Sequence, residues 1–335
     1  MSEEQEIDVL SVGDVVIDAF VKLLDDQARV DDENGYKRLN MPYGTKIPFD
    51  FAEVVNAVGN ASNAAVSFAK LGLKSALYAN VGNDQWGRDI IASLHEKNVD
   101  SRFVKVQAGK LSNYHYVLWY KDDRTILIKH EEYQYHWPQL HPDEIPKWIY
   151  FSSISKNAIP FHDKVVEWLE AHPDTKLAFQ PGTFQMDAGT ERLKGIYQHT
   201  EVLIVNREEA AFVGGGNHED IHDLFNKLHE LGPRIVVITD GPNGSYASEG
   251  EVRWRMPNYP DPAPPYERTG AGDSFASTFV AALIHGSNVE GALQWAPINA
   301  MSVVQGVGAQ KGLLDQKQMN DLLEKAPDWY QPERL

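Results

Sequence analysis

Short apolar runs bounded by glycine or polar residues recur along the chain, and segments of helical length separate them. Runs of this kind are typical of buried β-strands. We expect strands at residues 7–12, 75–81, 148–152, 176–180, 201–205 and 234–239. We expect helices at residues 59–72, 88–98, 161–171, 187–199, 207–213, 218–231, 273–284, 294–304 and 315–325. This alternation predicts an α/β fold, with a mostly parallel central sheet and helices on both faces.

Residues 102–130 follow a period of two instead. Tyr114, Tyr116 and Leu118 share one face, a turn follows at 121–124, and residues 125–129 return. This pattern predicts a long aromatic hairpin. The hairpin is too apolar to be exposed on both faces, so we expect it to cover a pocket or to pair with another subunit. Residues 21–50 are polar and irregular, and we expect short strands there.

Composition and charge narrow the function classes. The chain has 335 residues and no linker or internal repeat that would divide it, so we expect one large domain over residues 1–335. A formal net charge of −17 argues against nucleic acid as a partner. There is no cysteine, which excludes disulfides and thiolate zinc sites. The acidic N-terminus and the lack of a membrane-length apolar run predict a soluble, cytoplasmic protein.

The stretch at 267–276 combines a loop with a helix start. Four prolines lie just upstream, at positions 260, 262, 264 and 265, and oppose a helix there. Gly270, Ala271 and Gly272 are small enough for a ligand to approach the backbone, and an apolar helix follows. The N–H groups of a helix N-terminus bind anions. Asp273 at this point is either a general base beside an anion site or a helix cap, and the residues alone favour neither.

Several polar residues follow predicted strands, where open α/β sheets bind ligands. They are Asp14 and Asp18 after the first strand, Asn206 and Glu209 after a later one, and Thr239, Gly241 and Gly244 after the next. Each also has a plain structural reading as a turn, cap or surface residue. Asn63 near a helix start is either a cap or a ligand contact. Neither the Gly-x-x-x-x-Gly-Lys-Ser/Thr loop nor a dinucleotide fingerprint is present, which disfavours P-loop enzymes and standard dehydrogenases.

Residues 218–222 match the metalloprotease pattern His-Glu-x-x-His. On a helix, His218 and His222 would share a side. The buried stripe at Ile221, Leu224 and Phe225 leaves both histidines nearer to solvent, and the pattern provides no third ligand or cleft. We therefore interpret it as a solvated helix face.

In combination, the motifs resemble those of the ribokinase-like (PfkB) sugar and nucleoside kinase family over almost the whole chain. Thr269-Gly270-Ala271-Gly272-Asp273 resembles the C-terminal anion-hole signature of the family. The other motifs occur in the family's order; they are Gly59 to Asn63, Gly82-x-Asp84-x-x-Gly87, Asn206-x-x-Glu209 and Thr239-x-Gly241-x-x-Gly244. The resemblance implies a Rossmann-like three-layer sandwich with a small β-sheet lid, formed here by residues 19–52 and 102–132.

The resemblance also implies an ATP- and Mg²⁺-dependent kinase that phosphorylates a hydroxymethyl group of a sugar. Asp273 would be the general base, and the amides of Gly270, Ala271 and Gly272 would stabilise the transferred phosphoryl group. Substrate hydroxyls would be bound by Asp14, Asp18, Gly59 and Asn63. ATP would be bound by Asn206, Glu209, Thr239, Gly241, Gly244, Arg268 and Asn299, with Glu209 organising Mg²⁺ through water. The lid hairpin would form a homodimer.

Three departures from the family pattern leave questions open. Val58 replaces a glycine, Gln180-Pro181-Gly182 stands where Asp-Pro-Asn is common, and Glu267-Arg268 replaces Asp-Thr. The Asp of that last pair often helps to bind a monovalent cation, so a K⁺ requirement stays open. Arg268 either contacts an anionic ligand group or is a surface residue. A nucleoside kinase, with lid aromatics that stack on a base, and a non-catalytic binding regulator are the alternatives.

Overall fold

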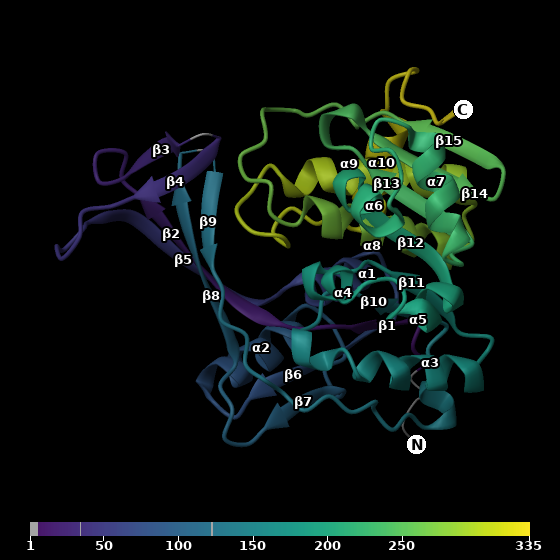
Figure 1. The fold of residues 1–335 in the computed structure, drawn as a ribbon, viewed down its shortest axis with the longest axis horizontal. Helices are drawn as coiled ribbons and strands as arrows, with labels where there is room; N and C mark the ends of the chain where they lie inside the picture. The colour runs from purple at the N-terminus through teal and green to yellow at the C-terminus, as the bar shows by residue number, and fades with distance from the viewer. Residues whose placement is uncertain (1–5, 34, 122) are drawn as a thin grey trace.

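A large central sheet organises the protein. The computed structural model describes residues 6–33, 35–121 and 123–335, and ten strands of these residues form the sheet in the order β16-β15-β14-β13-β12-β11-β10-β1-β6-β7 (Figure 1). The parallel strands are β1 Val9–Val12, β6 Ser75–Gly82, β7 Val104–Gln107, β10 Trp148–Phe151, β11 Lys176–Phe179, β12 Thr200–Asn206 and β13 Ile235–Thr239. The antiparallel edge consists of β14 Ser245–Glu249, β15 Val252–Met256 and β16 Glu333–Arg334.

Helices cover both faces of this sheet. The face with the larger buried cluster carries α1 Asn60–Lys70, α8 Ala271–Ile284, α9 Val289–Val303 and α10 Gln316–Glu324. The opposite face carries α3 Phe161–Ala171, α5 Lys194–His199, α6 Arg207–Gly214 and α7 Ile221–Glu230. Helix α2 Gln85–Glu96 packs in a third cluster, and α4 Thr183–Ala188 is a short helix after β11. The predicted α/β sandwich with a mostly parallel sheet is confirmed, and no helix of the described residues is long and apolar enough to cross a bilayer.

Several predicted helix boundaries are wrong by three residues or more. The helix expected at 294–304 begins earlier, at Val289, where the Asn288 side chain caps α9. The helix expected at 187–199 is divided, because α4 ends at Ala188, the following Gly189 has a φ of 84° that does not continue a helix, and α5 begins only at Lys194. The helix expected at 218–231 begins at Ile221, because the Asp220 carboxylate accepts hydrogen bonds from the amides of His222 and Asp223 and caps it. His218 therefore precedes the helix and does not share a helical face with His222.

A second, smaller sheet projects from one side of the molecule (left in Figure 1). In the described part of the chain its strands are β5 Phe49–Val58, β2 Val16–Leu23, β8 Asn113–Tyr120 and β9 Asp123–Leu127, in that order. Strands β8 and β9 pair antiparallel, which confirms the aromatic hairpin; Asp122 of its turn lies outside the described residues. Strands β3 Arg29–Glu33 and β4 Tyr36–Asn40 form a separate hairpin. The expected lid boundary at 102 is too early, because residues 104–107 pair with β6 as edge strand β7 of the central sheet.

The aromatic side chains of the second sheet pack mainly on one another. Trp119 is only 4% exposed, and it makes edge contacts with Phe51 and Tyr266 at ring-centroid distances of 5.9 and 5.3 Å. Phe20 is buried. The apolar side chains that remain exposed on this sheet include Phe49, Val54, Tyr116, Ile126 and Leu127. An exposed apolar surface of this kind is typical of a contact with another protein. The homodimer through the lid stays a prediction.

One ion pair joins the second sheet to the loop before α8. Arg124 on β9 places its Nη1 atom 3.4 Å from Oε1 of Glu267, whose side chain is 4% exposed. The same Glu267 oxygen accepts hydrogen bonds from the backbone amide and the hydroxyl of Thr269. Arg124 thus compensates a buried carboxylate that also fixes the start of the Gly270–Gly272 loop.

We expect Arg124→Met to lower the free energy of unfolding by roughly 1–3 kcal/mol, because it leaves Glu267 buried without its cation. The free energy of unfolding is measured by chemical denaturation. Limited proteolysis is the second readout, and the second sheet of the variant should be cleaved faster than that of the wild type. Arg29→Met, which removes an exposed lid arginine paired with Asp31, is the matched control. Equal stabilities of the two variants would contradict the role of Arg124.

Candidate active site

Asp273 lies in the first turn of α8, with its side chain buried. Three side-chain amides donate to its carboxylate. Asn60 donates to Oδ1 at 2.9 Å, Asn63 donates to Oδ2 at 2.8 Å, and Gln180 lies 3.4 Å from Oδ1. The carboxylate is therefore oriented by α1 and by the end of β11, and it does not fold back as a cap of its own helix. This geometry favours the general-base interpretation over the cap.

The charge of this carboxylate is set by opposing effects. Burial raises the pKa of Asp273, and the hydrogen bonds from Asn63, Gln180 and Asn60 lower it. No cation of the described residues pairs with the carboxylate. Burial is the larger effect, so the pKa of Asp273 lies above its ordinary value. A carboxyl group in this state is a stronger base than a solvated aspartate.

The loop before Asp273 has the conformation that an anion site requires. Gly270 adopts a left-handed φ of 83°, and a β-carbon there would lie 2.3 Å from the Ala309 side chain. At Gly272 a β-carbon would meet open space. Helix α8 begins at Ala271, whose amide donates to the Arg268 carbonyl at a long 3.4 Å, so the predicted anion hole lies at the first turn of this helix. The space at Gly272 admits a ligand close to this backbone.

A cavity of about 270 Å³ connects these features with the ends of two strands. Its lining residues are Asn60, Gln180, Ile204, Val205, Asn206, Glu209, Thr239, Gly270, Gly272 and Asp273. The structure thus brings together six residues that the sequence singled out from distant positions; these are Asn206, Glu209, Thr239, Gly270, Gly272 and Asp273. Their proximity agrees with a shared site, and their individual roles stay predictions.

Asn206 and Glu209 form a reciprocal cap at the start of α6. The Asn206 side chain accepts from the Glu209 amide at 2.8 Å, and the Glu209 carboxylate accepts from the Asn206 amide at 2.9 Å. Burial raises the pKa of Glu209, with a smaller lowering by the Asn206 amide. Asn206 and Glu209 therefore do cap the helix, and both residues also line the cavity. An anionic oxygen ligand of this kind suits Mg²⁺, directly or through water.

Gly241 and Gly244 lie in the turn after β13 and have φ values of 50° and 98°. A β-carbon at Gly244 would lie 2.3 Å from the Met256 carbonyl oxygen, which explains the glycine by backbone packing. Neither glycine lines the 270 Å³ cavity. Arg207 donates to Asp240 at 2.6 Å and so fixes this turn to the start of α6. The turn is thus positioned beside the cavity, and contact with a nucleotide stays a prediction.

The predicted acceptor residues lie where β1 and β2 meet α1. Asp14 is buried, and its carboxylate accepts from Tyr135 and Ser155 at 2.7 and 2.6 Å. Gly59 precedes α1 with a φ of 105°, and a β-carbon there would lie 2.9 Å from the Asp14 carbonyl oxygen. Since the next turn of α1 carries Asn60 and Asn63, this close contact links Asp14 to the groups that hold Asp273.

Asp18 on β2 and Asp14 each face one histidine, and the sequence did not predict either histidine as a site residue. His115 places Nδ1 3.3 Å from Oδ1 of Asp18, and His130 places Nδ1 3.6 Å from Oδ2 of Asp14. The two imidazole rings are 5.2 Å apart. The Asp18 Oδ1 and His115 Nε2 atoms are buried without a hydrogen-bond partner in the described residues. Polar atoms in this state are suited to a bound polar molecule.

The sequence does not predict the contacts of Asn60 and Gln180 with Asp273. Asn60 lies within a helix start of small residues, and Gln180 stands where the family pattern commonly has Asp. Nothing in the spacing of these two amides along the chain indicates that they share one partner. Asn299, by contrast, uses its amide within the fold, because it donates to the Thr278 hydroxyl and accepts from the Leu314 amide. Its contact with ATP stays a prediction.

Arg268 and the His-Glu-x-x-His segment are both on the surface. Arg268 is exposed, next to the buried Glu267. His218 is exposed and contacts Glu219, whereas His222 contacts Arg253. Within the described ranges, no group of three or more His, Cys, Asp or Glu residues is arranged to hold a metal.

The sequence matches a family model and several curated relatives. The family model of pfkB family carbohydrate kinases matches residues 51–316. A 5-dehydro-2-deoxygluconokinase of Bacillus velezensis is 26% identical over 355 aligned residues, which cover 96% of each chain. A ribokinase of Bacillus subtilis is 26% identical over 276 residues, covering 79% of this chain and 87% of the relative.

A solved structure has a similar fold. The structure of Arabidopsis thaliana ribokinase complexed with ribose and ATP has a TM-score of 0.78 and 20% identity, with 95% of this chain and 99% of that chain covered. At this identity the likeness shows the fold alone. The family match spans most of the chain and includes the loop, the amides and the carboxylate described above. The chain belongs to the pfkB family of carbohydrate kinases.

Proposed function

We propose that this sugar kinase transfers the γ-phosphoryl group of ATP to a hydroxymethyl group of its acceptor, with Asp273 as the general base. The main support for the proposal is the buried Asp273 carboxylate. It accepts hydrogen bonds from three side-chain amides and directly follows the Gly270–Gly272 loop. A base must lie within hydrogen-bond reach of the hydroxyl that it deprotonates, and the cavity beside Asp273 provides room for that hydroxyl.

The residues around the cavity fit the cofactors that the family implies. The first-turn amides of α8 would hold the phosphoryl oxygens, and the open space at Gly272 lets them approach. Glu209 and Asn206 would hold Mg²⁺ through water, and Thr239 would lie along the nucleotide. Bound Mg²⁺–ATP supplies the phosphoryl group and neutralises charge on it. Asp273 takes the proton of the acceptor hydroxyl as the oxygen–phosphorus bond forms and the bond to the ADP leaving group breaks.

The acceptor would lie between Asp273 and the carboxylates at the end of the sheet. Asp14, Asp18, Gly59 and Asn63 stay the proposed hydroxyl contacts, now with His115 and His130 beside them. Both histidines come from the second sheet or the segment after it, so a lid that closes here would surround the acceptor and exclude water. A cytoplasmic location is consistent with use of ATP.

Removal of the base is the first test. We expect Asp273→Asn to lower kcat by at least ~10²-fold, because the amide cannot accept the proton. The KM values should change much less, since the shape of the site is retained. The measurement is a coupled assay of ADP release. Asp261→Asn, an exposed acid at the start of the same loop, is the matched control and should keep wild-type turnover; near-wild-type turnover of Asp273→Asn would exclude the mechanism.

The acceptor class is tested with a panel of free sugars, sugar acids and nucleosides. We place 5-dehydro-2-deoxygluconate first, because the relative with that activity in its name aligns over 96% of both chains. We expect ATP consumption that depends strictly on an added sugar or sugar acid. A preference for nucleosides would favour the nucleoside-kinase alternative, and acceptor-independent binding of ATP without turnover would favour a regulator.

Arg268 provides a further prediction. If the exposed guanidinium reaches an anionic group of ATP or of the acceptor, Arg268→Ala should raise one KM by roughly threefold or more, as expected for a lost exposed charge contact. The exposed Arg255 in β15 offers the control variant Arg255→Ala. Unchanged KM values for both substrates would identify Arg268 as a surface residue.

A further inference from the structure

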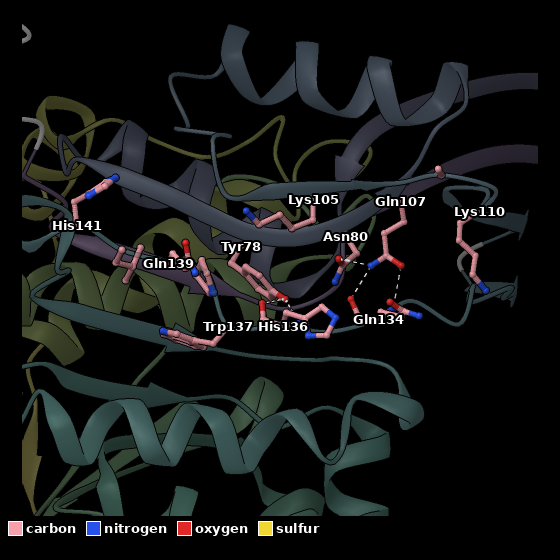
Figure 2. A pocket seen from close by; sticks show the side chains of 13 residues that line it. Tyr78, Asn80, Lys105, Gln107, Lys110, Gln134, His136, Trp137, Gln139 and His141 are labelled. Carbon is pink, nitrogen blue, oxygen red and sulfur yellow. Dashed lines mark hydrogen bonds between the residues drawn. The ribbon is translucent and has the colours of Figure 1, made fainter.

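A second cavity of the described residues is separate from the site around Asp273. It has a volume of about 990 Å³ and lies between strand β6, the edge strand β7 with the residues that follow it, and the segment 134–141. Its lining residues are Tyr78, Asn80, Lys105, Gln107, Ala108, Lys110, Gln134, His136, Trp137, Pro138, Gln139, Leu140 and His141 (Figure 2). None of them lines the cavity at Asp273. The volume is in the range of small-molecule sites.

The charge of this cavity is opposite to that of the protein. The chain has 48 acidic and 31 basic residues, yet the lining has Lys105 and Lys110, two histidines and no carboxylate. Lys105 has no ion-pair partner in the described part of the chain. Lys110 lies 3.6 Å from Glu131, which is outside the lining, so its charge is partly compensated. The lining therefore favours an anion.

Two buried side-chain atoms of this lining have no hydrogen-bond partner among the described residues, and both are donors. Asn80 is 1% exposed, and its Nδ2 atom has no hydrogen-bond partner, whereas its Oδ1 accepts from Gln107 at 2.7 Å. The Trp137 Nε1 atom is also buried without a partner. Figure 2 shows Asn80 between Tyr78 and Gln107 along the cavity. A buried donor without an acceptor costs free energy, and a ligand rich in acceptor oxygens would remove this cost.

From these observations we propose that this cavity binds a sugar phosphate. The phosphate would meet Lys105 and the free donor of Asn80, and Gln134 and Gln139 would meet the hydroxyls. A phosphate ion alone would leave most of the 990 Å³ unfilled. The proposal for binding does not depend on the function of the Asp273 site.

The cavity is connected to the acceptor site through one short segment. Gln134 and His136 line the cavity, and Tyr135 between them donates to Asp14 at 2.7 Å. Tyr78 fixes the segment on the cavity side, because its hydroxyl donates to the His136 carbonyl at 2.7 Å and accepts from the His136 amide at 3.1 Å. A ligand that orders this segment would hold Tyr135 on Asp14. Its effect on catalysis, which rests on the proposed function, would be a lower KM for the acceptor.

The test is calorimetric titration of the full chain with glucose 6-phosphate, without ATP or acceptor. We expect one site with a dissociation constant in the millimolar range or below, weaker binding of inorganic phosphate and no binding of glucose. Asn80→Asp keeps the acceptor for Gln107 and replaces the free donor by a carboxylate. This change and Lys105→Ala should each weaken binding at least tenfold, roughly the effect of one lost charge-assisted hydrogen bond.

Two further variants locate the ligand. Lys317→Ala, which removes an exposed lysine of α10, and Asp273→Asn should both bind glucose 6-phosphate like the wild type. Equal binding by Asn80→Asp and the wild type, loss of binding in Asp273→Asn, or equal affinity for inorganic phosphate would each overturn the proposal. In a kinetic assay the ligand should lower the acceptor KM of the wild type and not that of Asn80→Asp. An inactive wild-type enzyme would contradict the proposed function and leave the binding result intact.

Discussion

The buried carboxylate of Asp273 is the constraint on which the site depends. A charged group without a cation is costly in the interior, and amide donors offset that cost only when their geometry is fixed. Here the donors come from the first turn of α1 and from the end of β11, and Asn63 in turn accepts from Gln310. The position of Asp273 thus requires that α1, β11 and α8 meet at one edge of the sheet.

The predicted site residues lie on one side of the molecule because they come from this edge of the sheet. Parallel strands β1, β11, β12 and β13 all end there. Asn206 and Thr239 are the last residues of β12 and β13, and Asp14 and Gln180 follow β1 and β11. Helices α6 and α8 also begin at this edge. The second sheet adds Arg124, His115 and a covering surface. The buried ion pair of Arg124 and Glu267 joins this second sheet to the loop that precedes Asp273.

The sequence predicted the sheet and most helices well, because buried parallel strands are continuous apolar runs. It also predicted the Gly270–Asp273 loop, where local chemistry is unusual. It did not predict the contacts of Asn60, Gln180, His115 or Arg124, because the partner of each is more than 80 residues away along the chain. The pattern of apolar and polar residues does not show how strands of the two sheets are aligned with one another. The errors at Gly189 and Asp220 came from capping, which the apolar period does not reveal.

The most direct test of Asp273 as the base is the pH dependence of kcat/KM. Burial raises the pKa of Asp273, and only the ionised carboxylate accepts a proton, so activity should fall as the pH drops through a value above about 4, the ordinary aspartate pKa. Asn60 lowers this pKa through its hydrogen bond, and Asn60→Ala should move the acid limb to higher pH. An acid limb that stays in place in Asn60→Ala would contradict the account.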